Sequence, residues 1–264
     1  MLKKLLKYDL QWMLKVIVIY LTIGVALGVI GKLIEFLPDS LIFNIIEGIC
    51  KGAAVSLLIT GLVNAVIRSW VRLIHNLYKD EGYITNTLPI KTELHLISKV
   101  ISTLIIIIGS SIILFLMLAL MYLNKDSIEF LIESMKIYAS LADISVVGLL
   151  ILVVLLLLVE ILFIVLIGFF GIVWGYSFNA GKLGKSFLFA LIIYGAVQII
   201  NAILIVVVAL FNPNLYDILF NQVEVMDYEL LKGLLIGYTI FYVIVCGITF
   251  YLTYRKIKKG INID

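Results

Sequence analysis

Two features of the chain resemble places where enzymes do chemistry, and the first is a glycine-containing turn. Residues 175–185 read GYSFNAGKLGK, which resembles a phosphate-binding loop. Five residues separate the first two glycines where that motif has four, and Leu183 stands where Ser or Thr would hold magnesium. The turn also joins two apolar segments, with no strand before it. We therefore expect no ATP binding or hydrolysis by this chain itself.

The second feature is the small set of residues that bind metals or act as nucleophiles. His75 and His95 are the two histidines, and neither belongs to an H-E-x-x-H motif or an acidic pair at metal-ligand spacing. Cys50 and Cys246 are far apart and fit small packing residues. The sequence predicts no catalytic residue, no metal site and no cofactor bound by this chain. Triads assemble in space, however, so a membrane-embedded enzyme stays an alternative.

Glu160 interrupts the apolar run VVLLLLVEILFIVLIG. A charge in the middle of a membrane span costs about 2.5–3.5 kcal/mol on insertion scales, so this side chain must face protein or water, or be protonated. One interpretation is that it lines a substrate path together with other polar residues of the spans. The other is a neutral carboxyl that is hydrogen-bonded to a neighbouring span. The candidate partners in both cases are Gln198, Asn201 and Asn64.

These residues must be positioned by membrane-spanning helices. The chain has 264 residues, of which 63% are hydrophobic and 14% charged, with a mean hydropathy of +1.19. Soluble domains are closer to half apolar and a quarter charged. The apolar runs are continuous instead of alternating, which favours helices over a barrel. We predict an all-α integral membrane protein, a single transmembrane domain over 1–264, with six spans near 12–31, 50–74, 97–123, 146–174, 186–211 and 233–254.

Charge distribution predicts the orientation of the spans. Of the 20 Lys and Arg residues, 15 lie at the two chain ends and in the second-to-third and fourth-to-fifth links. The positive-inside rule then places both termini in the cytoplasm. Residues 1–11 carry Leu2, Leu5, Leu6 and Leu10 on one helical face, which predicts an amphipathic N-terminal helix at the inner interface. The two longer outer links show the same amphipathic pattern.

Three glycine pairs have the spacing that permits close helix approach in membranes. They are Gly24 and Gly28, Gly48 and Gly52, and Gly171 and Gly175. With 19 glycines in the chain such spacings arise by chance, so we treat the pairs as packing options.

The second-to-third link, LYKDEGYITNTLPIKTELHLISK at 77–99, is the longest polar run. We expect the second span to continue out of the membrane through Leu77 and Tyr78 and to end at Gly82 in a left-handed conformation. A connector with Pro89 follows, and Thr92 is a candidate N-cap for the next helix. The link is therefore predicted to be a helix–turn–helix element close to the membrane. A solvated loop with ordinary turn residues is the alternative.

The same link resembles the permease subunits of type-2 ABC exporters. The similar positions form an Asp-Glu-Gly-Tyr segment, then Thr-Leu-Pro, then a lysine at the mouth of the third span. They are Asp80, Glu81, Gly82, Tyr83, Thr87, Leu88, Pro89 and Lys99. The amphipathic N-terminus, the six spans and the basic C-terminal tail YRKIKK at 254–259 match that family in architecture, whereas the sequence likeness covers some twenty residues.

The resemblance implies a division of labour. A separate cytoplasmic subunit would bind ATP and magnesium, and the coupling segment at 75–96 would sit in a groove on that subunit. Two permease copies, or a copy and a paralogue, would form the substrate path as a dimer in a bacterial plasma membrane. Nothing in the sequence indicates a nucleic-acid partner. The alternatives to an exporter are the membrane-embedded enzyme and a scaffold or immunity-type membrane protein that does not transport.

Overall fold

The computed structural model describes residues 1–87, 92–141, 144–221 and 228–260, and the regular structure in these ranges is helical. Six of the helices are long and apolar enough to cross a membrane, which confirms the predicted all-α, membrane-type architecture. Contacts group the chain into two units, Met1–Ile128 and Glu129–Asn262, and each unit is described by itself.

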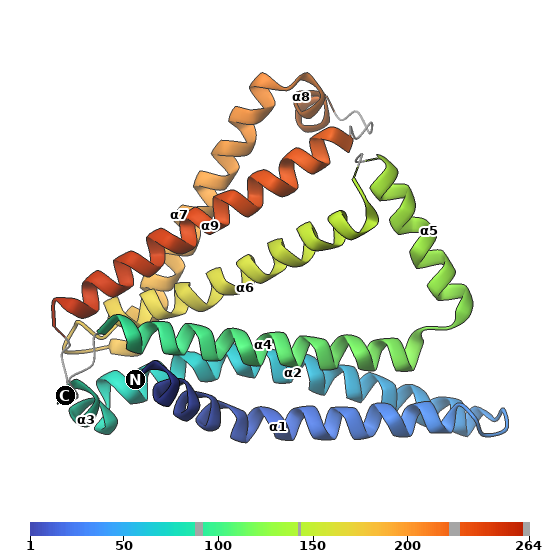
Figure 1. Ribbon diagram of the computed structural model, residues 1–264, viewed down its shortest axis with the longest axis horizontal. Helices are drawn as coiled ribbons and strands as arrows, with labels where there is room; N and C mark the ends of the chain where they lie inside the picture. Colours follow the sequence, from blue (N-terminus) through green and yellow to red (C-terminus); the bar gives the residue numbers. More distant parts are fainter. Residues whose placement is uncertain (88–91, 142–143, 222–227, 261–264) are drawn as a thin grey trace. The chain divides into compact units, whose positions relative to one another are not determined.

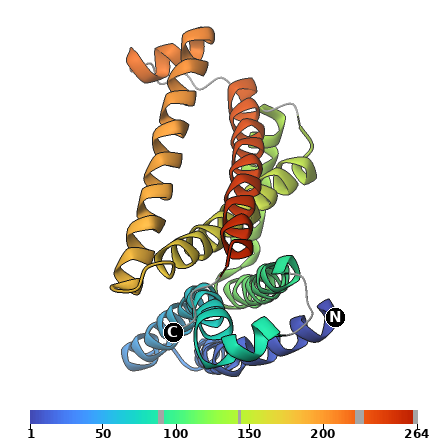
Figure 2. The ribbon, with the colours of Figure 1, turned by 90° about the vertical axis from the view of Figure 1, so that its left-hand side faces the viewer.

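The first unit is built from three long helices that lie side by side (Figure 1). They are α1 (Leu2–Ile34), α2 (Leu41–Tyr78) and α4 (Thr92–Tyr122), with the short α3 (Asp80–Thr87) after α2. The sequence predicts a separate interfacial helix over 1–11, whereas α1 is assigned as one helix from Leu2 onward. Its first turns run at an angle to the rest of α1 in both views (Figures 1 and 2).

Small residues bring these helices together. Gly28 of α1 faces Met117 and Met121 of α4 so closely that a Cβ atom there would overlap the Met117 side chain. Both methionines belong to a buried cluster with Ala54 and Leu58 of α2. Gly24 packs in the same way against Leu58. The first predicted glycine pair is therefore a packing contact, which explains how α1 can lie against both partners.

The turn between α1 and α2 is held by charge. Lys51 donates hydrogen bonds to Glu35 (2.8 Å) and to Glu47 (2.6 Å), and Lys32 donates to Glu35 at 3.0 Å. These lysines hold the pKa of the Glu35 carboxyl below its usual value, with the bond from Lys51 as the largest cause. Ser40 caps α2 by accepting a hydrogen bond from the Phe43 N–H.

The second unit is organised around α6 (Val146–Gly175), which contacts both α7 (Lys182–Phe211) and α9 (Tyr228–Lys258). Gly171 and Gly175 of α6 lie against Ser186 of α7, so the third predicted glycine pair is also a packing contact. By contrast, a Cβ atom at Gly48 or Gly52 would have no neighbour within 4 Å among the described atoms.

Two shorter helices complete the described chain. The amphipathic α5 (Lys125–Leu141) connects the two units and exposes apolar side chains such as Phe130 and Ile137. The α8 helix (Pro213–Phe220) begins with proline at its first position, where the missing N–H costs nothing. Asn212 caps it by accepting a hydrogen bond from the Leu215 N–H.

Candidate functional site

A buried network of charged and polar side chains joins four helices at one end of the first unit. It contains Asp9 of α1, Arg72 and Asn76 of α2, Glu81 of α3, and Ser98 and Lys99 of α4. All of these side chains except Glu81 belong to buried residues. Buried charges need partners and hydrogen bonds to be tolerated, so the arrangement constrains all four helices at once.

Arg72 is the centre of the network. Its Nε donates to Asp9 Oδ1 at 2.9 Å, and its Nη1 donates to both carboxylate oxygens of Glu81 at 2.7 and 3.0 Å. One guanidinium therefore links α1 and α3 through α2. The guanidinium group suits this role because its several N–H donors are fixed in one plane.

The other side of the network is supplied by α4. Ser98 donates to Asp9 Oδ2 at 2.8 Å, and the ammonium group of Lys99 donates to Asn76 Oδ1 at 2.6 Å. The same ammonium lies 3.8 Å from Asp9 Oδ2. Lys99 is only 1% exposed, so its charge is balanced by Asp9 inside the protein instead of by water. Asp9 thus stands between two cations from different helices.

Trp12 covers one side of the network. Its ring centroid is 4.3 Å from the Arg68 guanidinium and 5.4 Å from that of Arg72. Arg68 also donates a hydrogen bond to the Trp12 backbone oxygen at 3.1 Å. His75 packs near the same indole, with ring centroids 6.2 Å apart. Trp12 of α1 is therefore held against α2 by two arginines.

Glu81 differs from the rest of the network in its exposure. Its side chain is 47% exposed, although it accepts three hydrogen bonds, two from Arg72 and one from Asn76. The carboxylate is therefore accessible from outside and at the same time bonded to the buried arginine. A displacement of α3 would act on Arg72 and Asn76, and through them on Asp9 and Lys99.

The structure places most of the predicted coupling residues at this end of the unit. Leu77 and Tyr78 form the buried last turn of α2. Tyr83 and Thr87 are exposed on α3. Asp80 begins α3, but its side chain lies outside the described part, as do residues Leu88 and Pro89 altogether. Thr92, expected as an N-cap, is the first residue of α4.

The prediction that Gly82 ends the second span in a left-handed conformation is wrong. The break occurs at Lys79, whose backbone is extended, and Gly82 is part of α3 with an ordinary negative φ. A glycine is still required there, because an added Cβ would lie 2.7 Å from the Leu77 backbone oxygen. The Gly82 N–H also donates to the Lys79 oxygen at 2.6 Å. The glycine lets α3 fold tightly against the end of α2.

The four residues of the predicted substrate path are divided between the two units. Glu160 and Gln198 lie in the second unit, where both are in the electrostatic surroundings of the Tyr242 hydroxyl. Asn201 lines a pocket between α7 and α9. Asn64 belongs to the first unit and donates to the Thr60 backbone oxygen of its own helix.

The sequence interpretation passed over four network residues: Asp9, Arg72, Asn76 and Ser98. A usable signal exists in the periodicity. Asp9 shares the apolar face of Leu2 and Leu5, at helical spacing, where a solvated aspartate would not be placed. His95, Ser98, Lys99, Ser102 and Thr103 likewise recur at three- and four-residue intervals and form one polar stripe on α4, all of it buried.

Among the described residues, no group of three or more His, Cys, Asp and Glu side chains is arranged to hold a metal ion. Cys50 and Cys246 are both free thiols. Comparison with protein-family models, with curated proteins and with solved structures gave no match for this chain.

Proposed function

We propose that this chain is the membrane-spanning permease subunit of an ATP-driven exporter of the type-2 ABC class. The observation that supports it best is the bond between Glu81 and Arg72. An exposed helix in the first polar link carries a carboxylate that is tied to Arg72 and, through it, to Asp9. This is the connection that a coupling element needs between a soluble partner and the spans.

In this proposal, a separate cytoplasmic subunit binds ATP with magnesium and contacts α3 when it closes. The force acts on Glu81 and passes to Arg72 of α2, and then to Asp9 of α1 and Lys99 of α4. Because Arg72, Asp9 and Lys99 are buried and linked by ion pairs, they move together instead of yielding one by one. The chain supplies no catalytic residue for ATP hydrolysis.

The proposed topology has both termini in the cytoplasm of a bacterial plasma membrane, with the residue 1–11 segment at the inner interface. The excess of Lys and Arg at the two chain ends and in two links supports this orientation. The angled first turns of α1 and the exposed side chain of Tyr8 fit a segment lying along headgroups (Figure 1). Two permease copies, or a copy and a paralogue, then enclose the substrate path.

Affinity isolation of the tagged chain from its own membranes tests the proposal. The purification is done in mild detergent, bound proteins are identified by mass spectrometry, and ATP hydrolysis is measured in the same sample. We expect a soluble subunit with a phosphate-binding loop and vanadate-sensitive ATP hydrolysis. A chain that arrives without such a subunit and without hydrolysis contradicts the exporter and points to the enzyme or the scaffold.

A further inference from the structure

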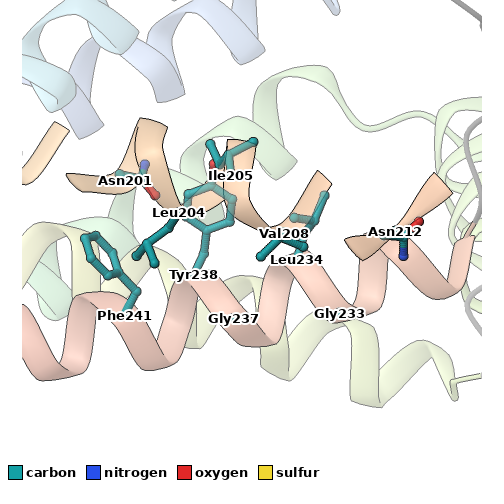
Figure 3. A pocket seen from close by; sticks show the side chains of 10 residues that line it. All are labelled: Asn201, Leu204, Ile205, Val208, Asn212, Gly233, Leu234, Gly237, Tyr238 and Phe241. Atoms are coloured by element: carbon teal, nitrogen blue, oxygen red, sulfur yellow. The ribbon is translucent and has the colours of Figure 1, made fainter. Parts of the chain in front are cut away.

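The second unit holds a pocket of about 550 Å³ between α7 and α9. Figure 3 shows side chains from α7 facing side chains from α9 across it. The α7 wall consists of Leu204, Ile205 and Val208, with Asn201 and Asn212 at its two ends. The volume of the pocket lies within the usual range for small-molecule sites, about 300–1,000 Å³.

Missing side chains create part of this space. Gly233 and Gly237 of α9 line the pocket, and a Cβ atom added at either position would have no neighbour within 4 Å. One end of the pocket is fixed by α8, because Leu234 packs against the buried pair of Ala209 and Leu215. The packing of Leu234 against Ala209 and Leu215 therefore fixes the distance between α7 and α9 at that end of the pocket.

The chemistry of the lining changes along the pocket. Between the two asparagines the α7 wall is aliphatic, and it faces Leu234, the Tyr238 ring and Phe241 of α9. Beyond Asn201 the surroundings become polar, with Gln198 and Glu160 near the Tyr242 hydroxyl. The aliphatic part of the α7 wall thus has a defined length, and the Asn201 side chain marks the end that lies deeper in the span.

That length matches one layer of a bilayer. Asn201 and Asn212 are eleven residues apart on one helix, or about 16 Å at 1.5 Å per residue. One leaflet contributes about half of a hydrocarbon core of ~30 Å. Asn212 lies where α7 ends, at the edge of the predicted span, and its amide nitrogen makes no hydrogen bond to the described residues. A headgroup at that end would meet a hydrogen-bond donor.

We propose that this pocket binds one acyl chain of a bilayer phospholipid. The chain lies between α7 and α9, with the ester and headgroup beside Asn212 and the methyl end near Asn201. This binding does not depend on the exporter proposal, since it requires only that the second unit be embedded in a membrane. It assigns Gly233 and Gly237 the role of making room for the lipid.

A photoactivatable lipid tests this site. The full chain is reconstituted in phosphatidylcholine nanodiscs that contain phosphatidylglycerol with a diazirine in the middle of one acyl chain. After illumination, labelled peptides are mapped by mass spectrometry. We expect labelling of the pocket residues in excess of that at Ile203, which is exposed on another face of α7.

The decisive variant is Gly237→Leu, which extends a side chain into the pocket from a position where the added Cβ meets no atom within 4 Å. It should lower pocket labelling about tenfold, because the leucine displaces several methylenes whose burial drives binding. Gly247→Leu is the matched control on the same helix, since Gly247 also has free space and does not line the pocket. Gly233→Leu serves as a second pocket-filling variant, and thermal unfolding establishes that each variant is folded.

Two results would overturn the proposal. One is equal labelling at the pocket and at Ile203 in the wild-type chain, which indicates ordinary lipid contact only. The other is a folded Gly237→Leu or Gly233→Leu variant with unchanged pocket labelling, or with a loss that Gly247→Leu shares.

Discussion

Glu81 on α3 accepts two hydrogen bonds from Arg72 on α2, at 2.7 and 3.0 Å, while about half of its side chain remains accessible. Arg72 in turn donates to the buried carboxylate of Asp9. The exposed carboxylate of the link is thus bonded to the interior of the helix bundle through Arg72, and Asn76 adds a further hydrogen bond at 3.3 Å.

Substitution of Arg72 should be strongly destabilising. In Arg72→Gln the buried Asp9 loses its closest cation, and breaking a buried ion pair costs about 3–5 kcal/mol. Thermal or denaturant unfolding in detergent measures the loss. The double variant Asp9→Asn with Arg72→Gln should recover part of it, because no uncompensated buried charge remains. If the double variant loses as much stability as the two single variants combined, the two residues are not coupled.

Glu81→Gln should leave stability nearly unchanged, within about 1 kcal/mol, because about half of the Glu81 side chain is exposed and Arg72 keeps its ion pair with Asp9. Under the proposed function, the substitution should nevertheless reduce the extent to which the permease changes the rate of ATP hydrolysis by the partner subunit in the isolated complex. Glu93→Gln is the matched control, because Glu93 is an exposed acid of the same link that lies in the first turn of α4, outside the network around Arg72. Equal effects of the two substitutions would contradict a specific role for Glu81.

Gly28→Leu should destabilise the first unit by about 1–3 kcal/mol, the usual range for overpacking. The added side chain would overlap Met117 of α4. Gly52→Leu is the control, because Gly52 has free space and leucine has the better helix propensity. Unfolding midpoints of both variants in the same detergent compare them. A tolerated Gly28→Leu would mean that α1 and α4 do not pack as described.

The ion pairs of Glu35 with Lys32 and Lys51, at the turn between α1 and α2, should contribute less stability in acid. The pKa of Glu35 is lowered by its hydrogen bonds from Lys51 and Lys32. A lowered folded-state pKa gives stability that is present above the unfolded value, near 4.3, and is lost as pH falls through the folded value. Unfolding midpoints of wild type and Glu35→Gln should therefore differ at neutral pH and converge once the pH lies below the lowered folded-state pKa of Glu35. A difference that persists in acid would exclude this cause.

The membrane-type helical architecture could be predicted from the sequence because continuous apolar runs have few other solutions. The position of the helix break, at Lys79 instead of Gly82, could not be predicted. A glycine is found both where helices end and where two backbones lie in close contact, and the sequence does not distinguish the two cases. The network around Arg72 also escaped prediction. Asp9, Arg72 and Lys99 are far apart in the sequence, and only the packing of α1, α2 and α4 reveals that they are partners.

The most direct test of the account is a site-specific crosslink from α3. A photoreactive amino acid replaces Tyr83, whose side chain is 57% exposed, and in a matched control it replaces Tyr138 of α5, which is 54% exposed. Both are illuminated in intact membranes, and crosslinked products are identified by mass spectrometry. The account predicts a crosslink from position 83 to a soluble ATPase subunit and none from position 138. No ATPase crosslink at position 83, or equal crosslinks at both, would contradict coupling through this link.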